Sequence, residues 1–162
     1  MSYVFPNTVA ALHNALKDGD LDVPHISGSS SLVAFTGAIT SGNFANLYGI
    51  DDCAPTADTR PEVQDFVKRY TDKYGYAPTY QSAESYDGIN IIAAAGETAG
   101  SNDPQKVRDA LATITYDGIC DNYHGEPSQG LIHHLVADTF DGTAKTVAVK
   151  QDYKLDDYTF SG

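Results

Sequence analysis

The chain has 162 residues, 41% of them hydrophobic, which is enough for one domain or a large piece of one to bury a core. Its 22 acidic residues against 10 Lys and Arg give a net charge of -12, which argues against binding to nucleic acid or to an anionic membrane surface, because both depend on basic side chains. No apolar run approaches the roughly 18 residues that a membrane-spanning helix needs.

The first third of the chain alternates between helical and extended patterns. Apolar residues at helical spacing predict a helix over residues 6–17. An extended run is predicted over residues 21–26, and a Gly/Ser turn over residues 27–31 leads into a short helix through Phe35. The next strand is predicted over residues 44–50.

Two long helices are predicted in the middle of the chain. Pro61 opens the first, since proline in the first turn of a helix loses no hydrogen bond, and Gly75 ends it. The second covers residues 81–99. Its predicted apolar face consists of Ile89, Ile92 and Ala93.

The last part of the chain changes from a helical to an extended period. Asn102-Asp103-Pro104 is a typical helix start and predicts a helix to about Ala112. The following pattern predicts strands over residues 119–124, 131–139 and 143–150, with a turn at residues 125–130 and a loosely held tail. This alternation of helices and strands is typical of an α/β fold.

Several short motifs follow one another between Arg60 and Gly130: PEVQDFVKRY, KYGYAP, YDG at a helix start, AGSNDPQKVRDAL and YDGI. The series resembles the C-terminal half of the type I periplasmic binding proteins of the leucine/isoleucine/valine class, the amino-acid receptors of ABC transporters. The resemblance extends back through LDVPHISGSSSLVAF. It implies a partial α/β fold with Rossmann-like sheet layers, flanking helices and closing antiparallel strands, without a counterpart of the receptor's first half.

The resemblance also implies a division of the chain. In such receptors two α/β lobes are joined by three crossings, and the ligand lies between the lobes. Residues 1–53 then form the end of the second lobe, residues 54–150 the returning part of the first lobe with the closing strands, and residues 151–162 a tail. Unpaired sheet edges would favour a homodimer of such a fragment.

The first candidate binding segment is the Gly/Ser turn with Ser29 and Ser30. Such a turn places backbone N–H groups and hydroxyls at the carboxyl end of a strand, where α/β sheets bind ligands. In relatives this loop faces the cleft, and some carry an acidic residue near the position of Ser30 for the ammonium group of the ligand. The alternative is a helix cap without a ligand.

The second candidate segment contains Gln81, Glu84 and Tyr86, and resembles the start of a helix at the cleft edge. Glu84 and Gln81 could pair with an ammonium or amide group, and Tyr86 could supply an aromatic wall. The alternative makes Tyr86 a core or hinge residue and Asp87 a structural partner.

Cys53 and Cys120 allow two interpretations. They form either two separate, partly buried thiols or one disulfide, depending on the compartment. The resemblance places both near the lobe crossing, so that a bridge is geometrically reasonable.

Metal binding and catalysis are not predicted. His133 and His134 are adjacent in a predicted strand, so their side chains point to opposite faces and cannot easily hold one ion together. Cys120 and His124 could form a nucleophile and base, but their spacing does not require this, and the G-x-S-x-G motif is absent. A Cys-dependent hydrolase and a ligand-free interaction module stay as alternatives.

The function that the resemblance implies is the solute-binding component of an ABC transporter. It would bind branched-chain amino acids or similar small polar solutes without a cofactor, close its lobes on the ligand and then contact an ABC permease. The opening segment lacks the basic region and cleavage site of a signal peptide, so the chain by itself would stay in the cytoplasm. As part of a receptor it would be extracytoplasmic, exported by a leader that this sequence does not carry.

Overall fold

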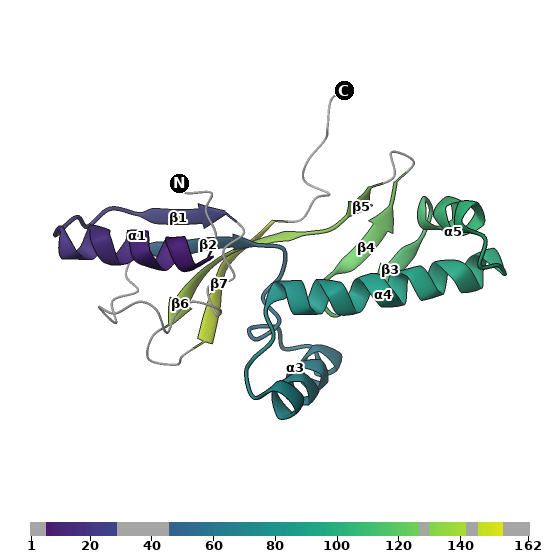
Figure 1. Cartoon of the computed structure of the whole chain (residues 1–162), viewed down its shortest axis with the longest axis horizontal. Helices are drawn as coiled ribbons and strands as arrows, with labels where there is room; N and C mark the ends of the chain where they lie inside the picture. The colour runs from purple at the N-terminus through teal and green to yellow at the C-terminus, as the bar shows by residue number, and fades with distance from the viewer. Residues whose placement is uncertain (1–5, 29–45, 127–129, 142–145, 154–162) are drawn as a thin grey trace, which may run out of the picture.

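The computed structural model describes residues 6–28, 46–126, 130–141 and 146–153, which form two units arranged along the long axis of the molecule (Figure 1). The first unit consists of α1 (Pro6–Asp18), β1 (His25–Gly28), β2 (Leu47–Asp51), β6 (Leu135–Asp141) and β7 (Thr146–Tyr153). The second consists of α3 (Pro61–Tyr74), α4 (Tyr80–Ala99), α5 (Pro104–Leu111), β3 (Thr115–Asp117), β4 (Asn122–Gly125) and β5 (Leu131–Ile132). The α/β class predicted from the sequence is confirmed.

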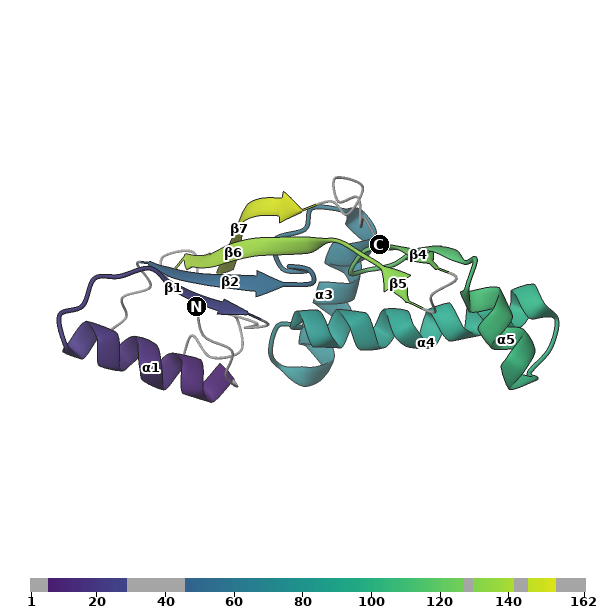
Figure 2. The same ribbon diagram turned by 90° about the horizontal axis from the view of Figure 1, so that it is seen from above.

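The first unit is built on a four-stranded sheet in the order β1-β2-β6-β7. β1 and β2 are parallel, with His25 opposite Leu47, and the other neighbouring pairs are antiparallel. α1 lies along one face of this sheet, where Val9 is fully buried (Figure 2). β1 begins later than the predicted extended run, because Leu21 and Val23 are outside the sheet and half exposed.

The second unit contains a three-stranded antiparallel sheet in the order β3-β4-β5. β3 was not predicted, and it pairs with β4 through Tyr116 and Tyr123. The predicted strand over residues 131–139 is in fact two strands, since β5 pairs with β4 whereas β6 pairs with β2. The chain therefore passes from one sheet to the other between these two strands.

The crossing of the chain from one sheet to the other between β5 and β6 changes two expectations from the sequence. His133 and His134 lie between β5 and β6 rather than within one strand. The closing strands β6 and β7 join the sheet of the first unit. The first unit thus draws its strands from both ends of the described chain, and the predicted division at residue 53 stays a prediction.

The helix boundaries follow the local signals in the sequence. α3 begins at Pro61, and Gly75 ends it with φ 79° while donating its N–H to the carbonyl of Thr71, a left-handed conformation that favours glycine. Val63 and Phe66 on this helix are buried. α4 and α5 also lie close to their predicted ranges.

The predicted apolar face of α4 is wrong. Ile89 and Ile92 are 72% and 56% exposed. The buried residues of the helix are Tyr80, Ala83, Asp87, Ile91 and Ala95. The buried face is centred on Asp87, whose carboxylate accepts backbone hydrogen bonds from the loop between β3 and β4. A charged residue at the centre of a buried face is not expected from apolar periodicity alone.

The core of the second unit surrounds the junction of α3, α4 and the β3–β4 hairpin. Its buried residues are Cys53, Phe66, Tyr80, Ala83, Ile91, Cys120 and Tyr123. Cys53 comes from the segment directly after β2, so this core also fixes the place where the chain enters the second unit.

Asp103 caps the N-terminus of α5, and its replacement tests how much this cap stabilises the fold. Its carboxylate accepts hydrogen bonds from the N–H groups of Gln105 and Lys106, both at 3.1 Å. We expect Asp103→Ala to lower the free energy of unfolding by about 1 kcal/mol, measured by urea denaturation. Asp109→Ala, on the same exposed helix, is the control, and an equal loss in both variants would contradict the capping role.

Candidate functional site

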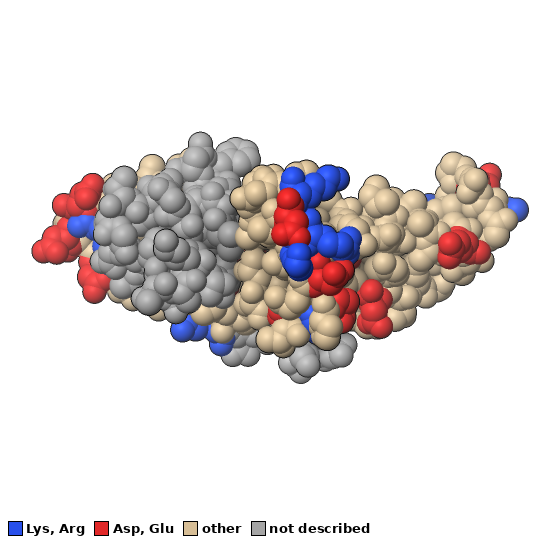
Figure 3. Space-filling model, turned by 90° about the horizontal axis from the view of Figure 1, so that it is seen from below, with Lys and Arg blue, Asp and Glu red and all other residues tan. Residues whose placement is uncertain are grey.

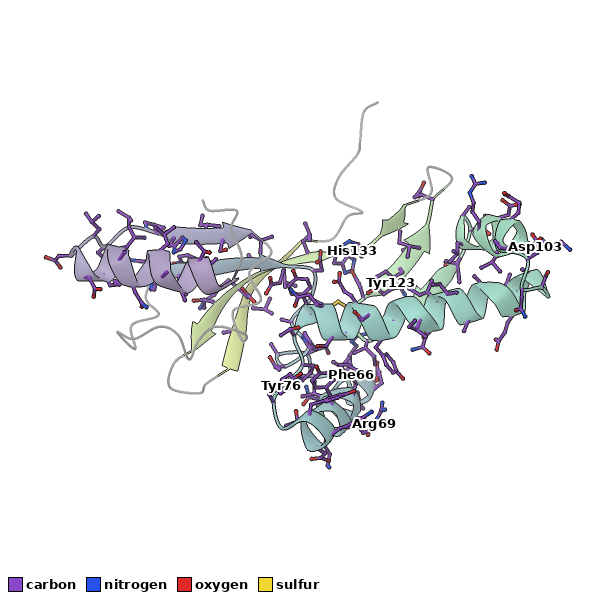
Figure 4. All side chains as sticks on the ribbon, in the orientation of Figure 1. Phe66, Arg69, Tyr76, Asp103, Tyr123 and His133 are labelled. Atoms are coloured by element: carbon purple, nitrogen blue, oxygen red, sulfur yellow. A yellow bond between two sulfur atoms is a disulfide. The ribbon has the colours of Figure 1, made fainter. Side chains whose placement is uncertain are left out.

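The two units meet where the chain crosses between them, beside the start of α4. One crossing follows β2 at Asp52 and Cys53, and another passes through His133 and His134 before β6. Figure 4 shows Tyr123 and His133 close together at this junction, near the disulfide, and their ring centroids are 6.3 Å apart. The candidate site is this crossing region.

Asp87 holds the loop between β3 and β4 against α4. Its carboxylate is buried and accepts hydrogen bonds from the N–H groups of Ile119 and Cys120, at 2.8 and 2.7 Å, and from the hydroxyl of Tyr123 at 3.2 Å. A side chain at Gly118 would collide with Asp87 and Tyr123, which explains the glycine. Burial raises the pKa of Asp87, while these three donors and Arg60 act in the opposite direction.

Arg60 holds the same loop from its other side. Its guanidinium donates to the carbonyls of Gly118 and Ile119, at 3.2 and 2.9 Å, and pairs with Asp58 at 2.8 Å. Because Asp87 binds the N–H groups and Arg60 binds the carbonyls, the loop is fixed through both kinds of backbone group.

A disulfide fastens the loop to the first crossing. Cys53 and Cys120 are bonded, with their Cα atoms 5.4 Å apart and 67 positions apart in the sequence. Of the two interpretations of the cysteines, the structure shows the bridge.

Two histidines connect the second crossing with acidic residues. His134 Nδ1 lies 3.0 Å from the carboxylate of Asp121, which also accepts the backbone N–H of His134. His133 Nδ1 lies 3.8 Å from the carboxylate of Asp52. The crossings are thus joined to each other and to the hairpin by polar contacts.

Four carboxyl groups, from Asp51, Asp52, Glu84 and Asp138, form what we call the carboxyl cluster. Burial raises the pKa of Glu84 to about 7, and its hydrogen-bonded neighbour Asp52 adds to the effect. Burial and the neighbouring Asp51 raise the pKa of Asp138 to about 7 as well. Near neutral pH Glu84 and Asp138 therefore hold protons that they could lose to solvent when a cation binds, because a positive charge would favour the ionised carboxylates.

The structure brings together only part of the predicted site. Ser29 and Ser30 lie outside the described residues. Glu84 is half buried in the carboxyl cluster, whereas Gln81 is exposed in the first turn of α4. The ring of Tyr86 packs against Phe66 of α3, at a centroid distance of 5.1 Å. Tyr86 is nevertheless 41% exposed, so it is not a core residue, and its role as an aromatic wall stays a prediction.

The sequence interpretation missed Asp52 and Asp121. A usable signal was present for Asp52, since two aspartates follow the predicted strand over residues 44–50 at its carboxyl end, where α/β sheets bind ligands. No comparable signal marked Asp121, because its contact with His134 depends on the passage between the two sheets.

Two further properties concern residues 6–28, 46–126, 130–141 and 146–153, namely metal binding and membrane spanning. This part of the chain contains no group of three or more His, Cys, Asp or Glu that could hold a metal ion. Likewise, no helix in it is both long and apolar enough to cross a membrane.

The protonation of Glu84 predicts a pH-dependent stability. The folded protein holds this proton up to about pH 7, whereas the unfolded chain releases it near the ordinary pKa of 4.5. The stability that Glu84 provides is therefore complete below pH 4.5 and is lost as the pH rises through 7. Since glutamine resembles the protonated form, we expect Glu84→Gln to gain about 1 kcal/mol over the wild type between pH 5 and pH 8 in urea denaturation.

The control for this prediction is Glu97→Gln, an exposed position on the same helix. An equal gain in the control, or no gain in Glu84→Gln, would contradict the protonated state of the cluster.

Comparisons with known proteins identify the class of this fold. The family model described as periplasmic binding protein matches residues 1–139. The chain belongs to the periplasmic binding protein family. The Leu/Ile/Val-binding protein homolog 1 of Brucella suis is 31% identical over 100 residues, which cover 59% of this chain and 25% of that protein.

Two solved structures share the fold. The leucine-binding protein LivK of Thermotoga maritima is similar with a TM-score of 0.80 and 19% identity, over 96% of this chain and 44% of that one. A solute-binding protein of an ABC transporter from Rhodopseudomonas palustris, in complex with 3,4-dihydroxybenzoic acid, gives a TM-score of 0.76 and 13% identity, over 94% of this chain and 44% of that one. The chain thus spans less than half the length of these structures, and the resemblance found in the sequence is confirmed at the level of fold and family.

Proposed function

We propose that this chain forms part of the solute-binding component of an ABC transporter and carries the ammonium-binding side of an amino-acid site. The observation that carries the proposal is the carboxyl cluster at the crossing of a periplasmic binding protein fold. The ligand would be a branched-chain amino acid or a similar small solute. The family is one of binding proteins, so we propose no catalytic activity.

The chemistry of the cluster supports an amino acid over an aromatic acid. The relatives include a leucine-binding protein and a protein that holds 3,4-dihydroxybenzoic acid. Both ligands carry a carboxylate, but only an amino acid carries an ammonium group. Glu84 and Asp52 could hold that cation once Glu84 loses its proton, whereas a ligand with only negative charge would be repelled.

Binding would proceed by closure of two lobes about the crossings. The β3–β4 loop is held by the disulfide, Asp87 and Arg60, which supports movement about the crossing segments rather than within the second unit. We propose an ABC permease as the partner of the closed form. An extracytoplasmic location is supported by the family and by the disulfide, because such bonds persist in oxidising compartments.

Ligand-observed NMR with four small molecules tests the proposal. Saturation transfer would be measured for leucine, for 4-methylpentanoate, which lacks the ammonium group, for 3-methylbutylamine, which lacks the carboxylate, and for benzoate. We expect transfer to leucine and to the amine, and none to the two molecules without a cation. The Glu84→Gln chain should lose about tenfold in affinity for the amine, because a charged hydrogen-bonded pair contributes about 1.4 kcal/mol or more.

A matched control separates charge from fold. Glu97→Gln removes one acidic charge from the same helix at an exposed position, and it should leave transfer to the amine unchanged. Transfer to benzoate and 4-methylpentanoate as strong as to leucine would contradict the ammonium site, and no transfer to leucine would contradict the proposed function as a whole.

A further inference from the structure

His133 joins the second crossing to a carboxylate of the proposed ammonium site. Its Nδ1 lies 3.8 Å from a carboxylate oxygen of Asp52, on the first crossing, and 2.8 Å from the carbonyl oxygen of His134. Because a carbonyl oxygen only accepts hydrogen bonds, Nδ1 carries a hydrogen in this arrangement. The ring of Tyr123 lies beside that of His133, at a centroid distance of 6.3 Å (Figure 4). The imidazole is thus held next to Asp52 by the backbone of its own crossing and by the β3–β4 hairpin.

Asp52 lies between His133 and Glu84. Its carboxyl group is hydrogen-bonded to that of Glu84 on α4, while its other neighbour is the imidazole of His133. The side chains of His133 and Asp52 are 32% and 28% exposed, so solvent screens this contact only in part. A change in the charge of His133 therefore acts on a carboxylate that the ammonium group of a ligand would use.

The titratable and charged groups around this contact come from every element that meets at the crossing. His134 lies 3.0 Å from Asp121, and these two form a pair of their own. Arg60 likewise pairs with Asp58 at 2.8 Å. The full set around the contact of His133 with Asp52 is Asp51 at the end of β2, Asp58 and Arg60 before α3, Glu84 and Asp87 on α4, Asp121 and Tyr123 on the hairpin, His134 beside β6 and Asp138 on β6.

We propose that His133 is a positioning residue for Asp52 and that its charge controls how strongly the site holds an ammonium group. The neutral ring leaves the negative charge of Asp52 available to the ligand. The protonated ring competes with the ammonium group for Asp52 and repels it. Histidine is the side chain that ordinarily changes charge between about pH 5 and pH 8, so the solute is held near neutral pH and released in acid. This inference rests on the proposed function.

The affinity for 3-methylbutylamine at two pH values tests the inference. Saturation-transfer titrations compare the wild type with His133→Asn at about pH 7.5 and about pH 5.5. The amide nitrogen of asparagine can donate to the carbonyl of His134 in place of Nδ1, but it cannot gain a charge. The amine stays charged in both samples, since alkylammonium groups lose their proton only near about pH 10.

We expect the wild type to lose about fivefold more affinity on acidification than His133→Asn, as for the competition of one partly exposed ion pair. Glu84 also gains its proton in this range. It does so in both chains, and the difference between them therefore reports the charge of His133.

A control separates the charge beside Asp52 from the charge of the whole surface. Figure 3 shows acidic side chains at both ends and in the middle of the face that it draws, and these attract any amine to some extent. His124→Asn removes an exposed histidine on β4 that contacts Thr115. This variant should lose affinity on acidification as the wild type does.

The imidazole signals of His133 provide a second measurement, made on the wild-type chain. If a charged ring weakens the amine, the bound amine must favour the neutral ring to the same extent. At about pH 6.5 the amine should move the signals of His133 towards the neutral form and leave those of His124 in place.

The possible results distinguish this inference from the proposed function. Amine binding with equal acid losses in wild type and His133→Asn, or with no response of the His133 ring, would overturn the inference and leave the proposed function standing. No amine binding by the wild type at either pH would contradict both.

Discussion

Replacement of Asp87 by alanine is expected to lower the free energy of unfolding by about 4 kcal/mol. The substitution leaves the N–H groups of Ile119 and Cys120 and the hydroxyl of Tyr123 without their acceptor in a buried region. Each unsatisfied buried donor costs about 1–3 kcal/mol, and some relaxation of the loop reduces the sum. Urea denaturation at pH 7 would measure the loss.

Asp65→Ala is the matched control for this prediction. Asp65 also accepts a hydrogen bond, from Arg69 at 2.7 Å, but both side chains are more than half exposed, so the loss should be below about 0.5 kcal/mol. A loss in Asp87→Ala no larger than this would show that Asp87 does not hold the hairpin loop.

Removal of the disulfide is expected to have an effect of similar size. The bond closes a loop across 67 positions, and chain-entropy reasoning gives about 4 kcal/mol of stabilisation for a loop of this length. The variant Cys53→Ser/Cys120→Ser would be compared with the oxidised wild type by urea denaturation. The wild type measured in excess reductant is the control, and it should lose the same stability as the double variant.

Two results would contradict this expectation. If oxidised wild type and double variant unfolded at the same urea concentration, the bridge would not stabilise the fold. If the reduced wild type kept the stability of the oxidised form, the loss in the variant would come from the buried serines instead.

The sequence predicted the described helices well because their signals are local, whereas the short helix predicted through Phe35 lies outside the described residues. Pro61 and Gly75 mark the ends of α3, and Asp103 with Pro104 marks the start of α5, through interactions within a few residues of each helix end. The orientation of α4 could not be predicted in the same way. It depends on Asp87 and on a loop 32 positions further along the chain, and apolar periodicity assigns no buried role to an aspartate.

The residues of the candidate site were also hard to predict, because their contacts join parts of the chain that are far apart in the sequence. Residues 131–139 were predicted as one strand, but the segments on either side of His133 and His134 belong to different sheets. Glu84 was predicted as a site residue and stays a prediction in that role, whereas its partner Asp52 lies 32 positions away and is brought to it only by the fold. Long-range pairing therefore accounts for most of what the sequence interpretation left open.

The most direct test of an amino-acid site at the crossing is a titration of the ¹⁵N-labelled chain with leucine, followed by the backbone amide signals. Because the chain spans less than half of the matched structures, a method that detects millimolar binding is appropriate. We predict saturable shifts of the amides of Asp52 and of residues 81–88, with little change in α5. Shifts confined to other elements, or none at all with leucine, would contradict the account.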